Sequence, residues 1–164
     1  MGVSAGRGDV KGPIAIGIAA DVIAWQQVHG RNDLPWQRPD PGRQPLRDPY
    51  RVWLSEVMLQ QTQVATVIPY FGAFVAAFPT VLDLADAPPE RVMSLWSGLG
   101  YYSRARNLQA AARRIVERHE GRFPADPAAL EDLPGVGRST AAAIAVFGFG
   151  VRAAILDGNV KRVF

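Results

Sequence analysis

The 164-residue sequence predicts an all-α fold, and three observations support that prediction. Hydrophobic residues make up 48% of the chain, which is enough to bury a core. Val, Ile and Thr do not alternate with polar residues over any long run, so a β-sandwich or β-barrel fits poorly. From Tyr50 onward, apolar residues instead recur at helical spacing, and Pro, Thr or Asp stand where helices would begin.

Before Tyr50 the sequence predicts one apolar helix between two polar segments. Residues 1–13 are rich in Gly and charge and are expected to be disordered. The segment from Ile14 to Val28 is predicted to form an amphipathic helix that ends at Gly30. It is too short to span a bilayer and lacks a signal-peptide cleavage pattern, so we expect a cytoplasmic protein without membrane contact. Residues 32–48 are dense in Pro, Gly and Arg, which predicts a loop.

From Tyr50 the sequence predicts a succession of helices, each marked by the residue that opens or ends it. Apolar residues follow helical spacing through Val67, and Pro69 is expected to break this run before a short helix that ends near Phe78. Further helices are predicted over residues 81–86, 88–98, 102–118, 127–132 and 139–147, with Thr80 and Asp126 as N-caps and Asp157 as the cap of a last helix.

Charge gives a weaker indication. Basic residues exceed acidic residues by 18 to 15, and all the basic residues except Lys11 and Lys161 are arginine, which binds phosphate through a planar fork. This balance hints at nucleic acid, although charge alone fits an ordinary solvated surface better. The chain has no cysteine, which excludes disulfides and cysteine-ligated metals within these residues, and no metal ligand is predicted. On the predicted helix 102–118, four arginines are expected to be available to solvent or to a ligand: Arg104, Arg106, Arg113 and Arg114.

The segment from Pro127 to Gly150 predicts two helices joined by Leu133-Pro134-Gly135-Val136-Gly137. The two glycines allow a sharp turn with positive φ and leave no side chain between the backbone amides and a ligand. Because a helix N-terminus favours an anion, a DNA phosphate is the expected occupant, and Arg138 adds charge. A lone Gly-X-Gly would more simply be a helix–helix turn, but the long apolar helix behind it and Leu-Pro ahead of it favour phosphate binding.

Two carboxylates stand out as candidates for catalysis. Glu56 lies in a mostly apolar helix, where burial is costly without a partner or a task and would raise its pKa toward that of a general acid. The alternative is a glutamate on a solvated helix face. Asp157 begins Asp-Gly-Asn-Val and is most simply an N-cap, yet an N-cap is held rigidly enough to be catalytic. Two carboxylates that flank a glycosidic bond can cleave it, but the sequence does not place these two together.

From about Leu34 to its last residue, the chain resembles the MutY-type adenine DNA glycosylases of the helix-hairpin-helix, endonuclease III-like superfamily. Five separated motifs occur in the family's order, which makes the match specific. They are Leu34-Pro-Trp36, Trp53 to Tyr70 (WLSEVMLQQTQVATVIPY), Leu95 to Leu108 (LWSGLGYYSRARNL), Leu133 to Ala141 (LPGVGRSTA) and Ile155 to Val163 (ILDGNVKRV).

The resemblance implies a role for each matching residue. Glu56 matches the general acid that protonates adenine, Asp157 matches the aspartate that stabilises the sugar cation, and Asn159 matches its active-site neighbour. Gln61 and Tyr101 match residues that wedge into the duplex around the oxidised guanine. The turn Gly135-Val136-Gly137, with Arg138 and Ser139 after it, matches the phosphate-binding hairpin. The implied reaction hydrolyses the glycosidic bond of a flipped adenine mispaired with 8-oxoguanine or guanine.

Ser139 separates this interpretation from its nearest rival. Endonuclease III-type relatives carry a nucleophilic lysine two residues after the second hairpin glycine, and serine cannot form the Schiff base that a lysine amine forms. We therefore predict a monofunctional glycosylase. A bifunctional glycosylase/lyase and a non-catalytic DNA-binding fragment of the same fold remain the alternatives.

The resemblance also implies parts that these residues do not contain. A [4Fe-4S] cluster is expected from the family, but its cysteine ligands are absent from this chain. We therefore expect residues 14–164 to form an incomplete catalytic domain, truncated before the cluster region. The apolar face of the first helix is expected to pack against the missing part and to be exposed without it. The loop 37–47 is longer than is common in the family. The expected partner is duplex DNA with an adenine mispair, bound by a monomer in the cytoplasm.

Overall fold

The computed structural model describes residues 13–42, 46–156, 158 and 160–163. Its described residues form helices, turns and one isolated β-bridge between Pro39 and Arg47, with no β-strand among them. The prediction of an all-α fold is therefore confirmed. The chain divides into two compact units, residues 1–33 and 34–164. The proposed domain limits at residues 13 and 14 stay predictions, and residues 1–12 lie outside the described part of the chain.

The described part of the first unit contains one helix, α1, which runs from Pro13 to His29; the sequence predicted a helix here, but its apolar residues are not confined to one face, so it is not amphipathic. Trp25 stacks near His29 with 5.3 Å between the ring centroids, and Gln26 donates a hydrogen bond to Asn32 just after the helix. Among the described residues of this unit, α1 has no other helix to pack against, and its large apolar side chains are exposed: Ile18, Val22, Ile23, Trp25 and Val28.

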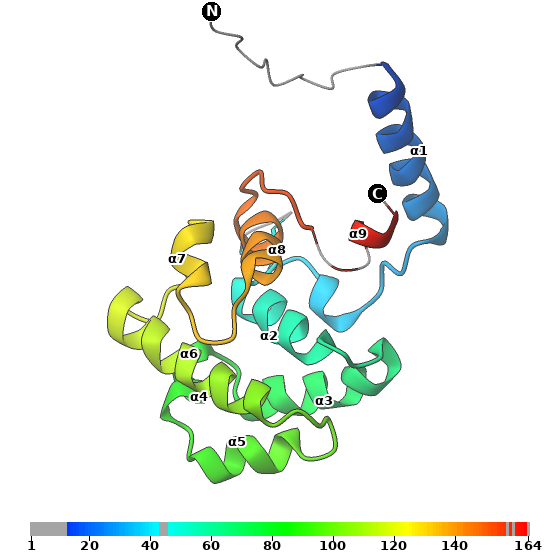
Figure 1. The fold of residues 1–164 in the computed structure, drawn as a ribbon. Coiled ribbons are helices and arrows are strands. Elements are labelled where there is room, and N and C mark those ends of the chain that lie inside the picture. Colours follow the sequence, from blue (N-terminus) through cyan, green and yellow to red (C-terminus); the bar gives the residue numbers. More distant parts are fainter. Residues whose placement is uncertain (1–12, 43–45, 157, 159, 164) are drawn as a thin grey trace, which may run out of the picture. The chain divides into compact units, whose positions relative to one another are not determined.

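The second unit is built around helix α2. Helices α3, α6 and α8 and the 3₁₀ turn Pro35–Gln37 pack against α2, while α4 and α5 pack on α6 and α7 packs on α8 (Figure 1). The helices are α2 Pro49–Leu59, α3 Val64–Ala77, α4 Val81–Asp86, α5 Pro89–Trp96, α6 Ser103–His119, α7 Pro127–Glu131, α8 Arg138–Phe149 and α9 Val160–Val163.

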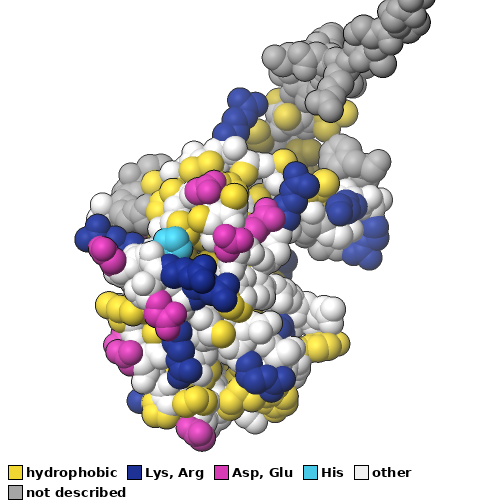
Figure 2. All heavy atoms as spheres, turned by 60° about the vertical axis from the view of Figure 1, so that its left-hand side comes forward, with side chains coloured by type: hydrophobic (Ala, Val, Ile, Leu, Met, Phe, Trp, Pro, Cys, Tyr) yellow, Lys and Arg dark blue, Asp and Glu magenta, His cyan; other side chains and the backbone are white. Residues whose placement is uncertain are grey.

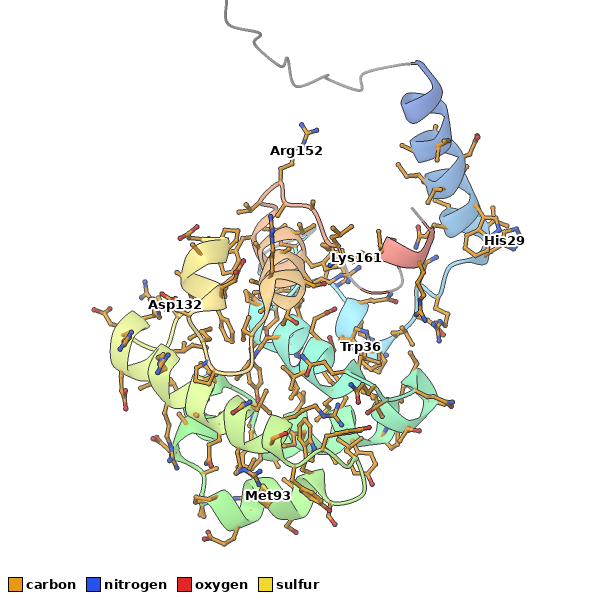
Figure 3. All side chains as sticks on the ribbon, viewed as in Figure 1. His29, Trp36, Met93, Asp132, Arg152 and Lys161 are labelled. Carbon is orange, nitrogen blue, oxygen red and sulfur yellow. The ribbon has the colours of Figure 1, made fainter. Side chains whose placement is uncertain are left out.

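Helix α2 is buried along most of its length, and the sequence explains how its neighbours approach. Asp48 caps its N-terminus by accepting a hydrogen bond from the Tyr50 amide at 2.9 Å, and burial raises the pKa of this carboxyl despite that bond. Small residues let α8 pack closely, since a Cβ on Gly148 would lie 3.0 Å from Pro49. Trp36 closes another side and meets Phe71 edge-on at 5.3 Å (Figure 3).

The break between α2 and α3 lies elsewhere than predicted. The helix was expected to run to Pro69, but it ends at Leu59, and Pro69 lies inside α3. Proline is tolerated there because it costs α3 a single amide donor and its ring is exposed. The backbone leaves helical geometry at Gln60, which has a ψ of 111°, and Gln61 follows with a φ of +56°. Proline was therefore the wrong signal for this boundary.

Other boundaries agree with the caps read from the sequence. Thr80 and Asp83 form a reciprocal capping box at the start of α4, with the Thr80 hydroxyl 2.6 Å from the Asp83 carboxylate. Asp126 accepts from the amides of Ala128 and Ala129 and opens α7. Helix α6 ends at His119, followed by Glu120 in the left-handed conformation.

Helix α6 corrects a second prediction at one of its four arginines, whereas Arg106 and Arg113 are exposed as predicted and Arg114 is half-buried. Arg104 is buried rather than available to solvent. Arg113 donates to the Ala85 carbonyl at 3.1 Å, and Arg114 donates to the carbonyl of Asp132, which lies at the end of α7 (Figure 3). Figure 2 shows basic side chains interspersed with acidic and apolar ones on the face it displays. Within the described residues, no helix is both long enough and apolar enough to cross a membrane.

Two leucines of α4 test whether this packing determines stability. Leu84 is fully buried, whereas Leu82 on the same helix is 49% exposed. We expect Leu84→Ala to lower the free energy of unfolding by about 2–5 kcal/mol, because it leaves a cavity in the core. The matched change Leu82→Ala should cost less than about 1 kcal/mol. Urea denaturation of both variants measures the difference, and equal losses would contradict the packing described here.

Candidate nucleic-acid interface and active site

The α7–α8 hairpin contains the glycines predicted to approach phosphate, and the two glycines differ in conformation. Gly135 has a φ of +73°, and a Cβ there would lie 2.8 Å from the Cβ of Asn107 on α6. Gly137 is the N-cap of α8 with φ −91° and ψ 172°, which any residue can adopt. The expectation of positive φ is thus confirmed at Gly135 and wrong at Gly137. Of the two hairpin glycines, the backbone and its surroundings require glycine at Gly135 and not at Gly137.

The space around Gly137 gives this glycine a different explanation. A Cβ at Gly137 would meet no atom within 4 Å, so the missing side chain leaves the end of α8 open. Among the described residues, no side chain caps the first turn of α8, which begins at the exposed Arg138 and the half-buried Ser139. Backbone N–H groups at such an uncapped helix start favour an anion.

Val136 anchors the hairpin between these two glycines. Its side chain is buried, and its amide donates to the Leu133 carbonyl at 3.1 Å. Its neighbour Leu133 is also buried. The structure thus places Val136 as the part of the hairpin held in the core, with the exposed Gly135 and Gly137 on either side.

Gln61 and Tyr101 share an uncommon backbone conformation. Their φ angles are +56° and +48°, and the other described non-glycine residue with positive φ is Glu120, an ordinary helix C-cap. The left-handed conformation costs a non-glycine residue roughly 1–2 kcal/mol. Both side chains are exposed, Tyr101 by 61%. Two exposed side chains held at a cost in free energy indicate a functional constraint at these turns.

Arg104 connects the two turns. Its Nη1 donates to the carbonyls of Val57, Met58 and Gln60 at 3.0, 2.9 and 2.6 Å. Its Nη2 donates to the Thr62 hydroxyl at 3.2 Å and to two carbonyls of the second turn, Leu99 at 3.0 Å and Gly100 at 3.3 Å. Burial lowers the pKa of this guanidinium, which nonetheless stays charged because arginine titrates so high.

Two aromatic side chains also donate hydrogen bonds to the second turn. The Trp96 indole donates to the Gly100 carbonyl at 3.1 Å, and the Tyr70 hydroxyl donates to the Ser97 carbonyl at 3.0 Å. A Cβ on Gly98 would overlap the Tyr70 hydroxyl, and Gly98 has a φ of +101°. The turn that carries Tyr101 is therefore fixed by its surroundings as well as by Arg104.

Glu56 lies on α2, one turn and a half before Gln61. Its side chain is half-buried, and the residues on either side of it, Ser55 and Val57, are buried. This placement fits neither a fully solvated helix face nor a sealed core. A carboxylate in this position is partly shielded from water but still reachable by a ligand.

Arg47 is a neighbour of Glu56 that the sequence analysis missed. Its amide donates to the Phe147 carbonyl at 2.9 Å, and its guanidinium lies 4.4 Å from the Phe147 ring centroid. Burial lowers the pKa of Arg47, and the negative charge of Glu56 opposes that shift. Nothing in the Pro- and Arg-rich segment marked this arginine, since its position is set by α8.

The other two predicted catalytic residues, Asp157 and Asn159, lie outside the described residues. Their proximity to Glu56 therefore stays a prediction. Within the described residues, no group of three or more His, Cys, Asp or Glu side chains is arranged to hold a metal ion. The sequence has no cysteine, so these residues do not fit the ligand set of an iron–sulfur cluster.

The chain is similar in sequence to known DNA repair proteins. The model of the HhH-GPD superfamily base excision DNA repair protein matches residues 54–164. The human protein named adenine DNA glycosylase is 51% identical over 144 residues, which cover 87% of this chain and 26% of that protein. The protein of the same name from Buchnera aphidicola subsp. Baizongia pistaciae is 47% identical over 142 residues, covering 87% of this chain and 38% of that protein. The chain thus spans about a quarter to two fifths of the length of these relatives.

Solved structures show the same similarity in three dimensions. A thermostable thymine-DNA glycosylase superposes with a TM-score of 0.81 at 28% identity, covering 90% of this chain and 65% of that one. A non-covalent endonuclease III–DNA complex gives a TM-score of 0.74 at 26% identity, covering 92% of this chain and 66% of that one. Both similarities support the helix-hairpin-helix glycosylase fold.

Two glycine substitutions in the hairpin separate its structural role from its phosphate-binding role. Gly137→Ala should leave stability within about 0.5 kcal/mol of wild type, because its φ and surroundings accept a Cβ. It should weaken duplex binding by about tenfold if a phosphate oxygen approaches the α8 amides. Gly135→Ala should instead destabilise the fold, because φ is +73° and Asn107 is too close.

Gly72→Ala on α3 is the matched control, because a Cβ there also meets no atom within 4 Å. It should leave duplex binding unchanged. Fluorescence anisotropy with labelled duplex measures affinity, and thermal unfolding measures stability. If Gly137→Ala binds as tightly as Gly72→Ala, the α8 amides do not bind phosphate.

Proposed function

The chain belongs to the HhH-GPD superfamily of base excision DNA repair proteins, and from this premise we propose that it removes mispaired adenine from duplex DNA. The observation that carries the proposal is helix α2, which presents the half-buried Glu56 and ends at Leu59, just before the positive-φ turn at Gln61. One helix and the turn that directly follows it thereby carry a candidate acid and a candidate duplex-contacting side chain. The names of the similar proteins, adenine DNA glycosylases, support adenine as the base.

In the proposed reaction, Glu56 donates a proton to N7 of a flipped adenine. The glycosidic C–N bond then breaks, its electron pair leaves with the base, and the sugar becomes an oxocarbenium-like cation. Asp157, with Asn159 beside it, would stabilise that cation until water adds. After donating its proton, Glu56 is anionic, and the nearby cationic Arg47 stabilises it electrostatically.

The proposed DNA contacts are of two kinds: some position the protein on the DNA backbone, and others distort the duplex. The α8 amides with Gly137, Arg138 and Ser139 would bind a backbone phosphate, which fixes the position of the protein without reading sequence. Gln61 and Tyr101 would enter the stack beside the orphaned 8-oxoguanine or guanine, which helps the adenine leave the duplex. The exposure of both side chains supports this role.

The proposed reaction stops once the base has been released, without cleavage of the DNA strand. Ser139 supports a monofunctional reaction, because a hydroxyl cannot form a Schiff base with the sugar. A [4Fe-4S] cluster would require cysteine ligands, and these 164 residues contain none. No step of the proposed reaction depends on the cluster. We further propose that the protein acts as a monomer on chromosomal DNA in the cytoplasm.

Replacing the candidate acid tests the reaction. Glu56→Gln should lower the single-turnover rate of adenine release from an adenine·8-oxoguanine duplex by about 10²–10⁴-fold, because the amide cannot donate the proton. Duplex affinity should stay within about twofold, since the change keeps the side-chain shape. Glu117→Gln, on the exposed face of α6, is the matched control and should excise normally. Excision by Glu56→Gln at a near wild-type rate would exclude Glu56 as the acid.

Borohydride trapping tests the absence of a lyase step. The wild-type chain should give no covalent adduct on damaged DNA, because Ser139 replaces the amine that would attack the sugar. Lys161 is one of two lysines in the chain, so Lys161→Arg is the control for incidental trapping. A wild-type adduct that persists in Lys161→Arg would contradict the monofunctional mechanism.

A further inference from the structure

We propose that Arg104 is a positioning residue that locks the turns at Gln61 and Tyr101 to each other, so that both side chains enter the duplex as one rigid wedge. The inference rests on the proposed function, because a wedge is useful only to a protein that opens a duplex. The lock itself is a property of the free protein. The two parts can therefore be tested separately.

The bonding pattern of Arg104 carries the first step. The guanidinium donates hydrogen bonds to oxygen atoms of residues 57–62 and to carbonyls of residues 99–100. These two stretches are about forty residues apart in sequence, and Arg104 is the side chain that bonds to both. In each turn, an accepting carbonyl belongs to the residue just before the positive-φ residue: Gln60 before Gln61, and Gly100 before Tyr101.

The positive charge of Arg104 suits the carbonyl oxygens at the C-terminal end of α2. Val57 and Met58 belong to the last turn of α2, where carbonyls have no partner within the helix and the helix dipole favours a cation. Arginine presents a planar fork of N–H donors, so it can serve two separate turns at once. A lysine ammonium offers its donors from a single point and cannot span both turns.

Packing extends the lock to the exposed ring and to the hairpin. The Arg104 guanidinium carbon lies 5.5 Å from the Tyr101 ring centroid and 5.4 Å from that of Trp96. One turn along α6, Asn107 lies directly under Gly135 of the hairpin. A cavity of only about 20 Å³ remains where Arg104, Asn107 and Gln60 meet Gly135. The candidate wedge and the candidate phosphate site therefore share one face of α6.

Amide hydrogen exchange of the free 164-residue chain tests the lock. Arg104→Lys should speed exchange by about tenfold or more in segments 60–63 and 98–102 together. Arg118→Lys, the same substitution at an exposed position near the end of α6, should change neither segment. If only one segment responds to Arg104→Lys, or neither does, the two turns are not locked by Arg104.

A milder variant keeps the test decisive should Arg104→Lys unfold the chain. Thr62→Val removes one acceptor of Arg104 from the first turn and nearly preserves volume. It should still speed exchange in segment 98–102, by roughly threefold, because the turns are coupled through Arg104. Faster exchange near Thr62 with an unchanged segment 98–102 would show independent turns and overturn the proposal.

Duplex containing 2-aminopurine beside an adenine·8-oxoguanine pair tests the wedge, in the Glu56→Gln background so that no base is excised. Binding should unstack the probe and raise its fluorescence. Arg104→Lys should reduce that rise as much as Tyr101→Ala does, and combining the two should reduce it no further. The salt dependence of binding should match that of Arg118→Lys, because Arg104 contacts no phosphate.

The outcomes separate the two proposals. If the chain with Arg104 intact gives no rise in fluorescence, the proposed function fails, while hydrogen exchange still decides whether Arg104 locks the turns. If exchange confirms the lock but Arg104→Lys leaves the fluorescence rise intact, the locked turns are not the wedge and the inference is wrong.

Discussion

The burial of helix α2 is the constraint on which the rest of the structure depends. A helix surrounded by α3, α6, α8 and the 3₁₀ turn must satisfy its polar ends inside the protein, where water is scarce. Asp48 does so at the N-terminus and Arg104 does so at the C-terminus. The chain leaves α2 at Gln60 and turns through positive φ at Gln61, and Arg104 satisfies carbonyls that the ended helix leaves without an intrahelical partner. Glu56 lies between these two fixed ends, so its position is set by the whole helix.

Helix α6 holds the two parts of the candidate DNA interface together. Arg104 bonds to the turns that carry Gln61 and Tyr101, and Asn107 supports Gly135 of the hairpin. The hairpin in turn opens α8, which packs against α2. We therefore propose that the N-terminus of α8 and the turns at Gln61 and Tyr101 contact the same DNA duplex and move little relative to each other. This arrangement suits a protein that must grip a backbone while it unstacks one base.

The sequence predicted what depends on neighbouring residues. Thr80 and Asp126 cap the helices that they were expected to cap, because capping requires only a side chain and the next three amides. Prediction from the sequence failed where segments distant along the chain determine where a helix ends or where a side chain lies. Pro69 suggested a helix end that instead lies at Leu59, and Arg104 looked like a surface charge although six oxygen atoms from two turns surround it. Arg47 was missed for the same reason, since Phe147 on α8 positions it. The two hairpin glycines look alike in sequence, and only the presence of Asn107 near Gly135 distinguishes them.

The central claim is that this arrangement removes adenine, and the product itself is the most direct evidence. Free adenine can be quantified by liquid chromatography and mass spectrometry after a single turnover of the wild-type chain on two duplexes that differ only in the base opposite one adenine. The account predicts about one adenine released per bound duplex when that base is 8-oxoguanine, and none when it is thymine. A folded chain that binds the mispaired duplex and releases no adenine would contradict it.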